Sequence, residues 1–197
     1  MAACASLTRQ CWLFAIGSSL FALATAPRFP GWVGAAPADL LCFVGSWFFT
    51  TAAWMQLVLA DRAERLEWSA AAAQFAGTLL FNLSTGAAVR AHAVLAERRY
   101  VWVPDVTGSL FFLISGAMAM AAVAAVGAVR SGSRDWITNA VNLTGCVAFG
   151  VSAAAAFIRK DGVTADEWLA NFGTFLGALC FLAAALIALP RHSRSAV

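Results

Sequence analysis

Neutral polar side chains are the residues in this sequence that could do chemistry inside its long apolar stretches. Gln74, Thr78 and Asn82 recur every four residues, so on a helix they lie along one face. Asn139 and Asn142 lie three residues apart and form a similar stripe in a later stretch. Amide and hydroxyl groups both donate and accept hydrogen bonds. The two stripes therefore have the chemistry to bind an uncharged polar molecule.

Two interpretations of these stripes stay open. In the first, the segments 68–89 and 135–158 enclose a small polar or lipid-like ligand, with Phe81 and Phe149 as its apolar wall. In the second, Gln74 and Asn82 bond to Asn142, Ser84 or backbone carbonyl groups and lock the bundle, because buried polar groups need partners. The candidate residues for this ligand site or polar network are Gln74, Thr78, Asn82, Ser84, Asp105, Asn139 and Asn142.

Asp105 stands at the edge of an apolar stretch, directly after Pro104 and three residues before Gly108. It is either a helix-capping residue or an acidic group at the mouth of a cavity. His92 and His192 are isolated, and the five cysteines include no CxxC pair. Metal sites and catalytic centres need clusters of such residues. We therefore predict a protein that is not an enzyme, with no catalytic residue, no metal and no cofactor.

The elements that position these residues follow from the distribution of charge. The chain has 197 residues, of which 61% are hydrophobic and 12% are charged. Six stretches contain no Asp, Glu, Lys or Arg, namely 10–26, 40–60, 68–89, 106–129, 136–158 and 168–190. A helix needs roughly 20 apolar residues to cross a bilayer. The pattern predicts an all-α, polytopic membrane protein.

We expect a single transmembrane domain over residues 1–197, built as a six-helix bundle in the cell (inner) membrane. Its helices are expected at approximately 10–26, 39–60, 68–89, 104–129, 135–158 and 167–190. An even number of spans places both termini on one side, and the slight excess of Arg and Lys there favours the cytoplasm. The net charge of +3 gives no indication of nucleic-acid binding.

A short string recurs once in each expected helix. Its copies are GSSLF at 17–21, GSWFF at 45–49, GTLLF at 77–81, GSLFF at 108–112, GCVAF at 145–149 and a weaker GTFLG at 173–177. Residues four apart share a helix face, and small residues let helices approach closely in lipid. The predicted packing residues are Gly17, Phe21, Gly45, Phe49, Gly77, Phe81, Gly108, Phe112, Gly145, Phe149 and Gly173.

The phenylalanines of this string lie about halfway along their expected helices. Successive helices run in opposite directions, so only a central position keeps such a residue at one depth in all of them. We therefore predict that Phe21, Phe49, Phe81, Phe112 and Phe149 cluster near the middle of the membrane. The spacing of nine residues from Trp to Gly, in 68–77 and again in 136–145, also indicates an internal repeat.

The strings that carry these features resemble those of a known group of proteins. They are WLFAIGSSLF, FVGSWFFTTAAW, QFAGTLLFNLSTGAA, VPDVTGSLFFLISGA and NLTGCVAFGVSA. They look like segments of uncharacterised multi-span proteins of high-GC Gram-positive bacteria, some of which carry a YrhK-like domain, a short membrane unit with a GSxxF element. The resemblance covers most of the chain and implies an integral membrane protein. The group has no assigned activity, so the resemblance implies no catalytic residues.

Together these patterns favour an integral membrane protein without catalytic machinery that serves as a packing, assembly or lipid-interacting subunit. Its expected partners are membrane lipids, together with further copies of itself or a larger membrane complex, and not nucleic acid. The alternative function is a transporter or binder of a neutral small molecule, held between the third and fifth expected helices.

Overall fold

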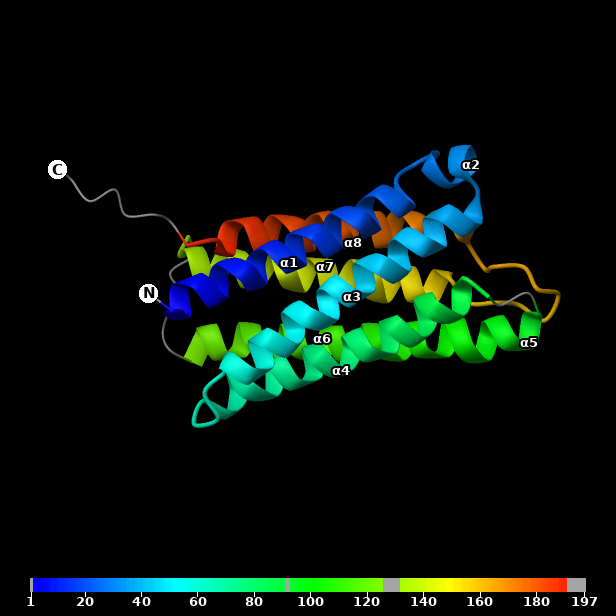
Figure 1. Cartoon of the computed structure of the whole chain (residues 1–197). Coiled ribbons are helices and arrows are strands. Elements are labelled where there is room, and N and C mark those ends of the chain that lie inside the picture. The colour runs from blue at the N-terminus through cyan, green and yellow to red at the C-terminus, as the bar shows by residue number, and fades with distance from the viewer. Residues whose placement is uncertain (1, 91–92, 126–131, 191–197) are drawn as a thin grey trace.

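The computed structural model describes residues 2–90, 93–125 and 132–190, and within these ranges the chain is helical with no β-strand. Six long helices lie side by side (Figure 1). They are α1 (Ala2–Thr25), α3 (Ala35–Leu59), α4 (Arg65–Ala88), α6 (Val103–Ala125), α7 (Arg134–Ala155) and α8 (Glu167–Ala188). The prediction of an all-α protein is confirmed.

Short helical elements join some of the long helices. They are α2 (Phe29–Val33), α5 (Val94–Ala96) and the π-helix η1 (Glu97–Trp102). η1 leads directly into α6, and its Arg98 side chain donates two hydrogen bonds, of 3.0 and 2.6 Å, to the carbonyl oxygen of Ile158. This contact ties the segment after α7 to the start of α6.

Five helical segments have the length and composition to cross a membrane. They are Ser6–Thr25, Ala35–Leu59, Val94–Ala125, Arg134–Ala155 and Glu167–Ala188. α4 is not among them, so the predicted number of six spans is not confirmed. This helix is less apolar because it carries Gln74, Asn82 and several hydroxyl side chains. Five such segments are typical of a multi-pass membrane protein.

The six long helices form a closed ring of three consecutive pairs. The closest packing is within the pairs α1 and α3, α4 and α6, and α7 and α8. Contacts of α3 with α4, α6 with α7, and α8 with α1 join the pairs into the ring. The start of α1 and the end of α8 lie at the same end of the bundle (Figure 1). Within each pair the two helices run in opposite directions, so both ends of the ring are built from three helix starts and three helix ends.

Each pair is held together by a reciprocal contact between glycine and phenylalanine. A Cβ added to Gly77 would lie 2.7 Å from two ring carbons of Phe112, and one added to Gly108 would lie 2.7 Å from a ring carbon of Phe81. Each of these Cβ atoms would also lie 3.1 Å from the other glycine's carbonyl oxygen. Gly17 and Gly45 face Phe49 and Phe21 in the same way, and Gly145 and Gly177 face Phe181 and Phe149. Only glycine allows this approach.

Six buried phenylalanines meet where the pairs come together, and we call them the Phe layer. They are Phe21, Phe49, Phe81, Phe112, Phe149 and Phe181. Phe21, Phe81 and Phe149 contact one another edge to face, with ring centroids 5.6 to 6.3 Å apart. Phe181 contacts Phe49 at 5.9 Å and Phe112 at 6.0 Å. The structure thus brings the five predicted phenylalanines together and adds a sixth.

The Phe layer has two tiers, where a single level was expected. Each phenylalanine follows its glycine by four residues, so its ring is displaced from the glycine toward the end of its own helix. Helices α1, α4 and α7 run one way and their partners run the other way, so the two sets of rings are displaced in opposite directions. The result is two triangles of rings, stacked on each other.

The sixth copy of the repeated string is GALCF at 177–181, four residues after the predicted GTFLG. Gly177 faces Phe149, and Phe181 completes the Phe layer. Gly173 is also a packing residue, but it faces the backbone of α7: a Cβ added to it would lie 3.0 Å from the carbonyl oxygen of Ala148. The predicted register of this copy is therefore corrected by one helical turn.

Candidate functional site

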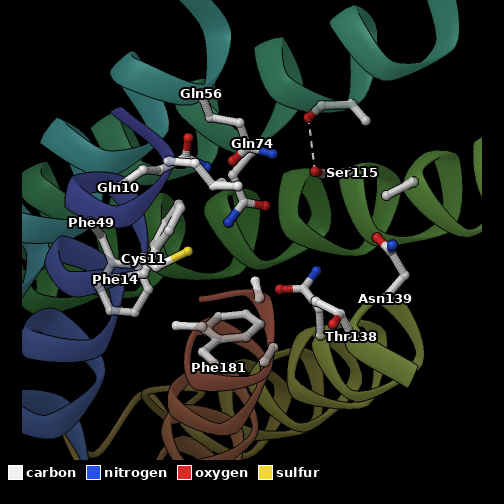
Figure 2. A pocket seen from close by; sticks show the side chains of 17 residues that line it. Gln10, Cys11, Phe14, Phe49, Gln56, Gln74, Ser115, Thr138, Asn139 and Phe181 are labelled. Carbon is white, nitrogen blue, oxygen red and sulfur yellow. Dashed lines mark hydrogen bonds between the residues drawn. The ribbon is translucent and has the colours of Figure 1, made fainter. Parts of the chain in front are cut away.

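The bundle contains a polar cavity of about 170 Å³ at the end where α1 starts, and Figure 2 shows it. All six long helices contribute to its lining. Its amide and threonine side chains are Gln10, Gln56, Gln74, Thr138, Asn139 and Asn142, and we call this cavity the amide chamber. In Figure 2 the three glutamines gather on one side of the cavity, and Thr138 and Asn139 lie across from them.

Gln74 is the central residue of the amide chamber. Its side chain is 5% exposed and forms no hydrogen bond with any residue that the structure describes. Gln10 and Gln56 likewise have no such partner for their amides in the described part of the chain. The hydroxyl of Thr138 is buried and unpaired as well. Gln74 and the Thr138 hydroxyl are buried, whereas Gln10 and Gln56 are half-buried. Because buried polar groups are normally hydrogen-bonded, the unpaired Gln74 and Thr138 indicate that the contents of the cavity complete their bonds.

The other polar groups of the chamber are partly satisfied within the bundle. Asn139 donates to the carbonyl oxygen of Asp135 at 2.9 Å. Asn142 makes a long contact of 3.9 Å with the sulfur of Cys146. The amide oxygens of both side chains remain able to accept a hydrogen bond. They therefore add acceptors to the chamber.

The lining of the amide chamber carries no charge. Among the described residues that form it there is no Asp, Glu, Lys or Arg. Phe49 and Phe181 of the Phe layer close its inner end, and the small side chains of Ala70, Ala119 and Ala184 leave the space open. The chamber is thus a neutral, hydrogen-bonding compartment with an apolar floor.

A second cavity, of about 270 Å³, lies on the other side of the Phe layer. Phe21 and Phe81 form its floor, and three acidic residues line it. These are Asp39, Asp105 and Glu167, and we call this cavity the acidic chamber. Hydroxyl groups of α1, α4 and α8 and the amide of Asn171 complete its polar lining.

The Phe layer separates the two chambers. The space left among its rings is about 10 Å³. A cavity needs roughly 10–15 Å³, measured in this way, to hold one water molecule, and a water needs polar partners as well. The layer is therefore dry and closed in this structure.

The structure divides the predicted candidate residues among different places. Gln74, Asn139 and Asn142 line the amide chamber, and Ser84 and Asp105 line the acidic chamber. Thr78 lies beside the Phe layer and donates to the carbonyl oxygen of Phe75 at 2.7 Å. Asn82 lines neither chamber and donates to the hydroxyl of Thr50 on α3 at 2.9 Å.

The two interpretations of the polar stripes each describe a part of the structure. Asn82 has a packing role, as in the second interpretation, but its partner is Thr50 on α3 and not Asn142, Ser84 or a backbone carbonyl. Gln74 faces a cavity, as in the first interpretation. The cavity is enclosed by all six long helices and not by the third and fifth alone. α4 and α7 are separated in the ring by α6.

Gln10, Gln56 and Thr138 are chamber residues that lie outside the predicted set. A signal for them exists in the sequence. Gln10 precedes Gly17 by seven residues and Gln56 follows Gly45 by eleven. Because paired helices run in opposite directions, residues before glycine in one helix and after glycine in its partner lie at the same end of the bundle.

None of the family models, curated proteins or solved structures with which the chain was compared matches it. The resemblance to proteins with a YrhK-like domain therefore stays a prediction. Fold and site together define a class: a helical bundle with five candidate membrane spans, in which a closed aromatic layer separates a neutral chamber from an acidic one.

Proposed function

We propose that the protein is a six-span membrane protein of the cell membrane, with α4 as its additional span. α4 has 24 residues, and the ring places it between α3 and α6, two candidate spans of similar length. At about 1.5 Å per residue it is long enough to cross a hydrocarbon layer of about 30 Å. The three glycine–phenylalanine pairs support an internal repeat of one two-helix unit. We place both termini in the cytoplasm.

The function that we propose is the binding of a small uncharged polar solute in the amide chamber, as a binder or a transporter. The observation that carries this proposal is Gln74, whose amide is buried and unpaired against the cavity within the described part of the chain. Asn82, by contrast, lines neither chamber and donates from its amide N–H group to the hydroxyl of Thr50 on α3, while its buried amide oxygen has no partner in the described part of the chain.

The chamber limits the charge and the size of this solute. A charged solute would lose its hydration without gaining an opposite charge, since the described lining residues are neutral. The cavity of about 170 Å³ is similar to the engineered cavity of roughly 150 Å³ that accommodates benzene. Glutamine and asparagine side chains both donate and accept. Small alcohols and amides fit these requirements.

The packing or assembly role that the composition favours is the weaker proposal. It explains the Phe layer and the glycine contacts, because helices in lipid associate through close packing. It gives no reason for unpaired glutamines from α1, α3 and α4 around one cavity. Transport would require the Phe layer to open, and a binder would keep it closed.

The proposal is tested by adding acetamide, glycerol or propionamide to the purified full chain in detergent. Tryptophan fluorescence during heating reports unfolding, and the chain has eight tryptophans. At least one of these solutes is expected to raise the Tm of the wild type in a saturable manner, because a ligand that binds only the folded state stabilises it. Gln74→Leu should lose this response.

Asn82→Leu is the matched control, because Asn82 is an amide on the same helix that pairs outside the chamber. It should lower the starting Tm and keep the response to solute. The proposal is wrong if no solute stabilises the wild type, or if Gln74→Leu responds as the wild type does. Osmotic swelling of proteoliposomes in the same solutes then separates a transporter from a binder.

A further inference from the structure

The acidic chamber has the composition of a site for a positively charged ligand. Asp39 on α3 and Asp105 on α6 line it, and its described lining includes no Lys or Arg. The third carboxylate, that of Glu167, also lines an adjoining outer cavity, and Arg28 lines this outer cavity with it. Glu167 therefore has a basic side chain nearby. Asp39 and Asp105 therefore line a cavity whose described residues include no basic side chain to balance their charge.

Neither of these two aspartates is paired with a residue that the structure describes. No hydrogen bond or ion pair joins Asp39 or Asp105 to a residue of the described ranges. Asp61, Asp161 and Asp166, by contrast, each accept a hydrogen bond from a backbone N–H group. Asp105 lies in the first turn of α6, as expected of a capping residue, but it accepts no capping hydrogen bond from the described residues. Unpaired carboxylates in a membrane-embedded bundle are costly and typically serve a site.

A hydroxyl group gives an independent indication of a ligand. Ser84 is 5% exposed and lines the acidic chamber, and it has no hydrogen-bond partner in the part of the chain that the structure describes. The neighbouring hydroxyls of Thr25 and Thr85 are satisfied, since each donates to a backbone carbonyl of its own helix. Ser84 thus offers an unused acceptor and donor to whatever the chamber contains.

We propose that the acidic chamber binds a small organic ammonium ion. Asp39 and Asp105 would balance its charge, and Ser84 would accept one of its N–H groups. The aromatic rings of Phe21 and Phe81 line the floor, and ammonium groups are attracted to such rings. The cavity of about 270 Å³ has room for an organic cation, and no group of three metal-ligating side chains occurs among the described residues.

This site is separate from the amide chamber, because the closed Phe layer lies between them. The proposal goes beyond solute binding and does not depend on it. Ammonium binding could hold while the amide chamber takes no solute, and the reverse is also true. The experiment therefore includes a variant of each chamber.

The test uses the purified full chain in detergent, with ethylammonium chloride and sodium chloride at equal ionic strength. Ethylammonium should raise the Tm in a saturable manner and give a heat of binding, whereas sodium should have little effect. Asp39→Asn and Asp105→Asn should each weaken binding by about tenfold or more, because each removes a charge that faces the ligand. Asp61→Asn, a change at an exposed loop carboxylate, should leave the affinity unchanged.

Two further variants keep the test decisive. Ser84→Ala removes one hydroxyl without a charge change and should weaken ethylammonium binding severalfold, even if an aspartate variant fails to fold. Gln74→Leu should bind ethylammonium as the wild type does. The proposal is overturned by equal effects of the two salts, by wild-type affinity in the Asp105→Asn or Ser84→Ala variant, or by loss of binding in Gln74→Leu.

Discussion

Replacing Gly108 by alanine tests the packing on which both chambers depend. The added Cβ would lie 2.7 Å from Cδ2 of Phe81 and 3.1 Å from the carbonyl oxygen of Gly77. Phe81 cannot move away easily, since it stacks on Phe112 at 4.9 Å and meets Phe149 at 5.6 Å. Overpacking costs ~1–3 kcal/mol, and we expect the upper half of this range, ~2–3 kcal/mol, because the second contact is with backbone. Alanine returns ~1 kcal/mol of helix propensity, so the expected net loss is about 1–2 kcal/mol.

For a chain of this length, a loss of that size corresponds to a fall in Tm of roughly 2–8 °C. Thermal unfolding in detergent, followed by tryptophan fluorescence, measures it. The control is Gly150→Ala, whose Cβ would meet only the flexible side chain of Leu113, at 3.1 and 3.8 Å. This variant should keep the wild-type Tm within about 1 °C or raise it.

A second substitution identifies the clash as the cause. Phe81→Leu removes the ring that the new Cβ would meet, so the double variant with Gly108→Ala should be more stable than the sum of the two single effects. A coupling of ~0.5–3 kcal/mol is expected for residues in contact. Strict additivity, or a Gly108→Ala variant as stable as Gly150→Ala, would refute the reciprocal packing.

Three further predictions concern single contacts, each measured as a change in Tm or in unfolding free energy. Asn82→Leu should cost about 0.6–1.7 kcal/mol by removing the bond to Thr50, and Thr50→Val should then add little. Ser115→Ala should cost a similar amount, because the Ser115 hydroxyl donates to the carbonyl oxygen of Ala70 on α4 at 2.8 Å. Phe181→Ala should cost ~3–5 kcal/mol, as much as truncation of any other ring in the Phe layer.

The helical architecture could be predicted from the sequence because the charge-free stretches mark the helices and the repeated glycines mark their contact faces, and both patterns lie within single helices. The six long helices overlap the six expected ranges, and five phenylalanines of the repeated string meet as expected. The sequence predicts the sixth copy one turn early because GTFLG and GALCF share Gly177, and both Gly173 and Gly177 make close contacts. Only the partner helix decides between them, since Gly145 faces Phe181.

The chambers were harder to predict because they are assembled from residues far apart in the chain. Helical spacing on one helix grouped Gln74 with Asn82, yet one faces a cavity and the other pairs with α3. The number of residues between a polar side chain and the glycine of the repeated string predicts better which chamber that side chain lines. Gln74 and Asn142 each precede their glycine by three residues in helices that run the same way, and both line the amide chamber.

The modest hydropathy of α4 is a consequence of its place in the ring. One face of this helix carries Gln74 into the amide chamber, Thr78 beside the Phe layer and Ser84 into the acidic chamber. A helix that served packing alone would have no need for polar groups at all three levels, because lipid-embedded helices associate through small residues such as Gly77. Of the residues that keep α4 from resembling a membrane span by composition, Gln74 and Ser84 line the two cavities, whereas Asn82 pairs with Thr50 on α3. This placement of Gln74 and Ser84 supports the proposal that the two chambers bind polar molecules.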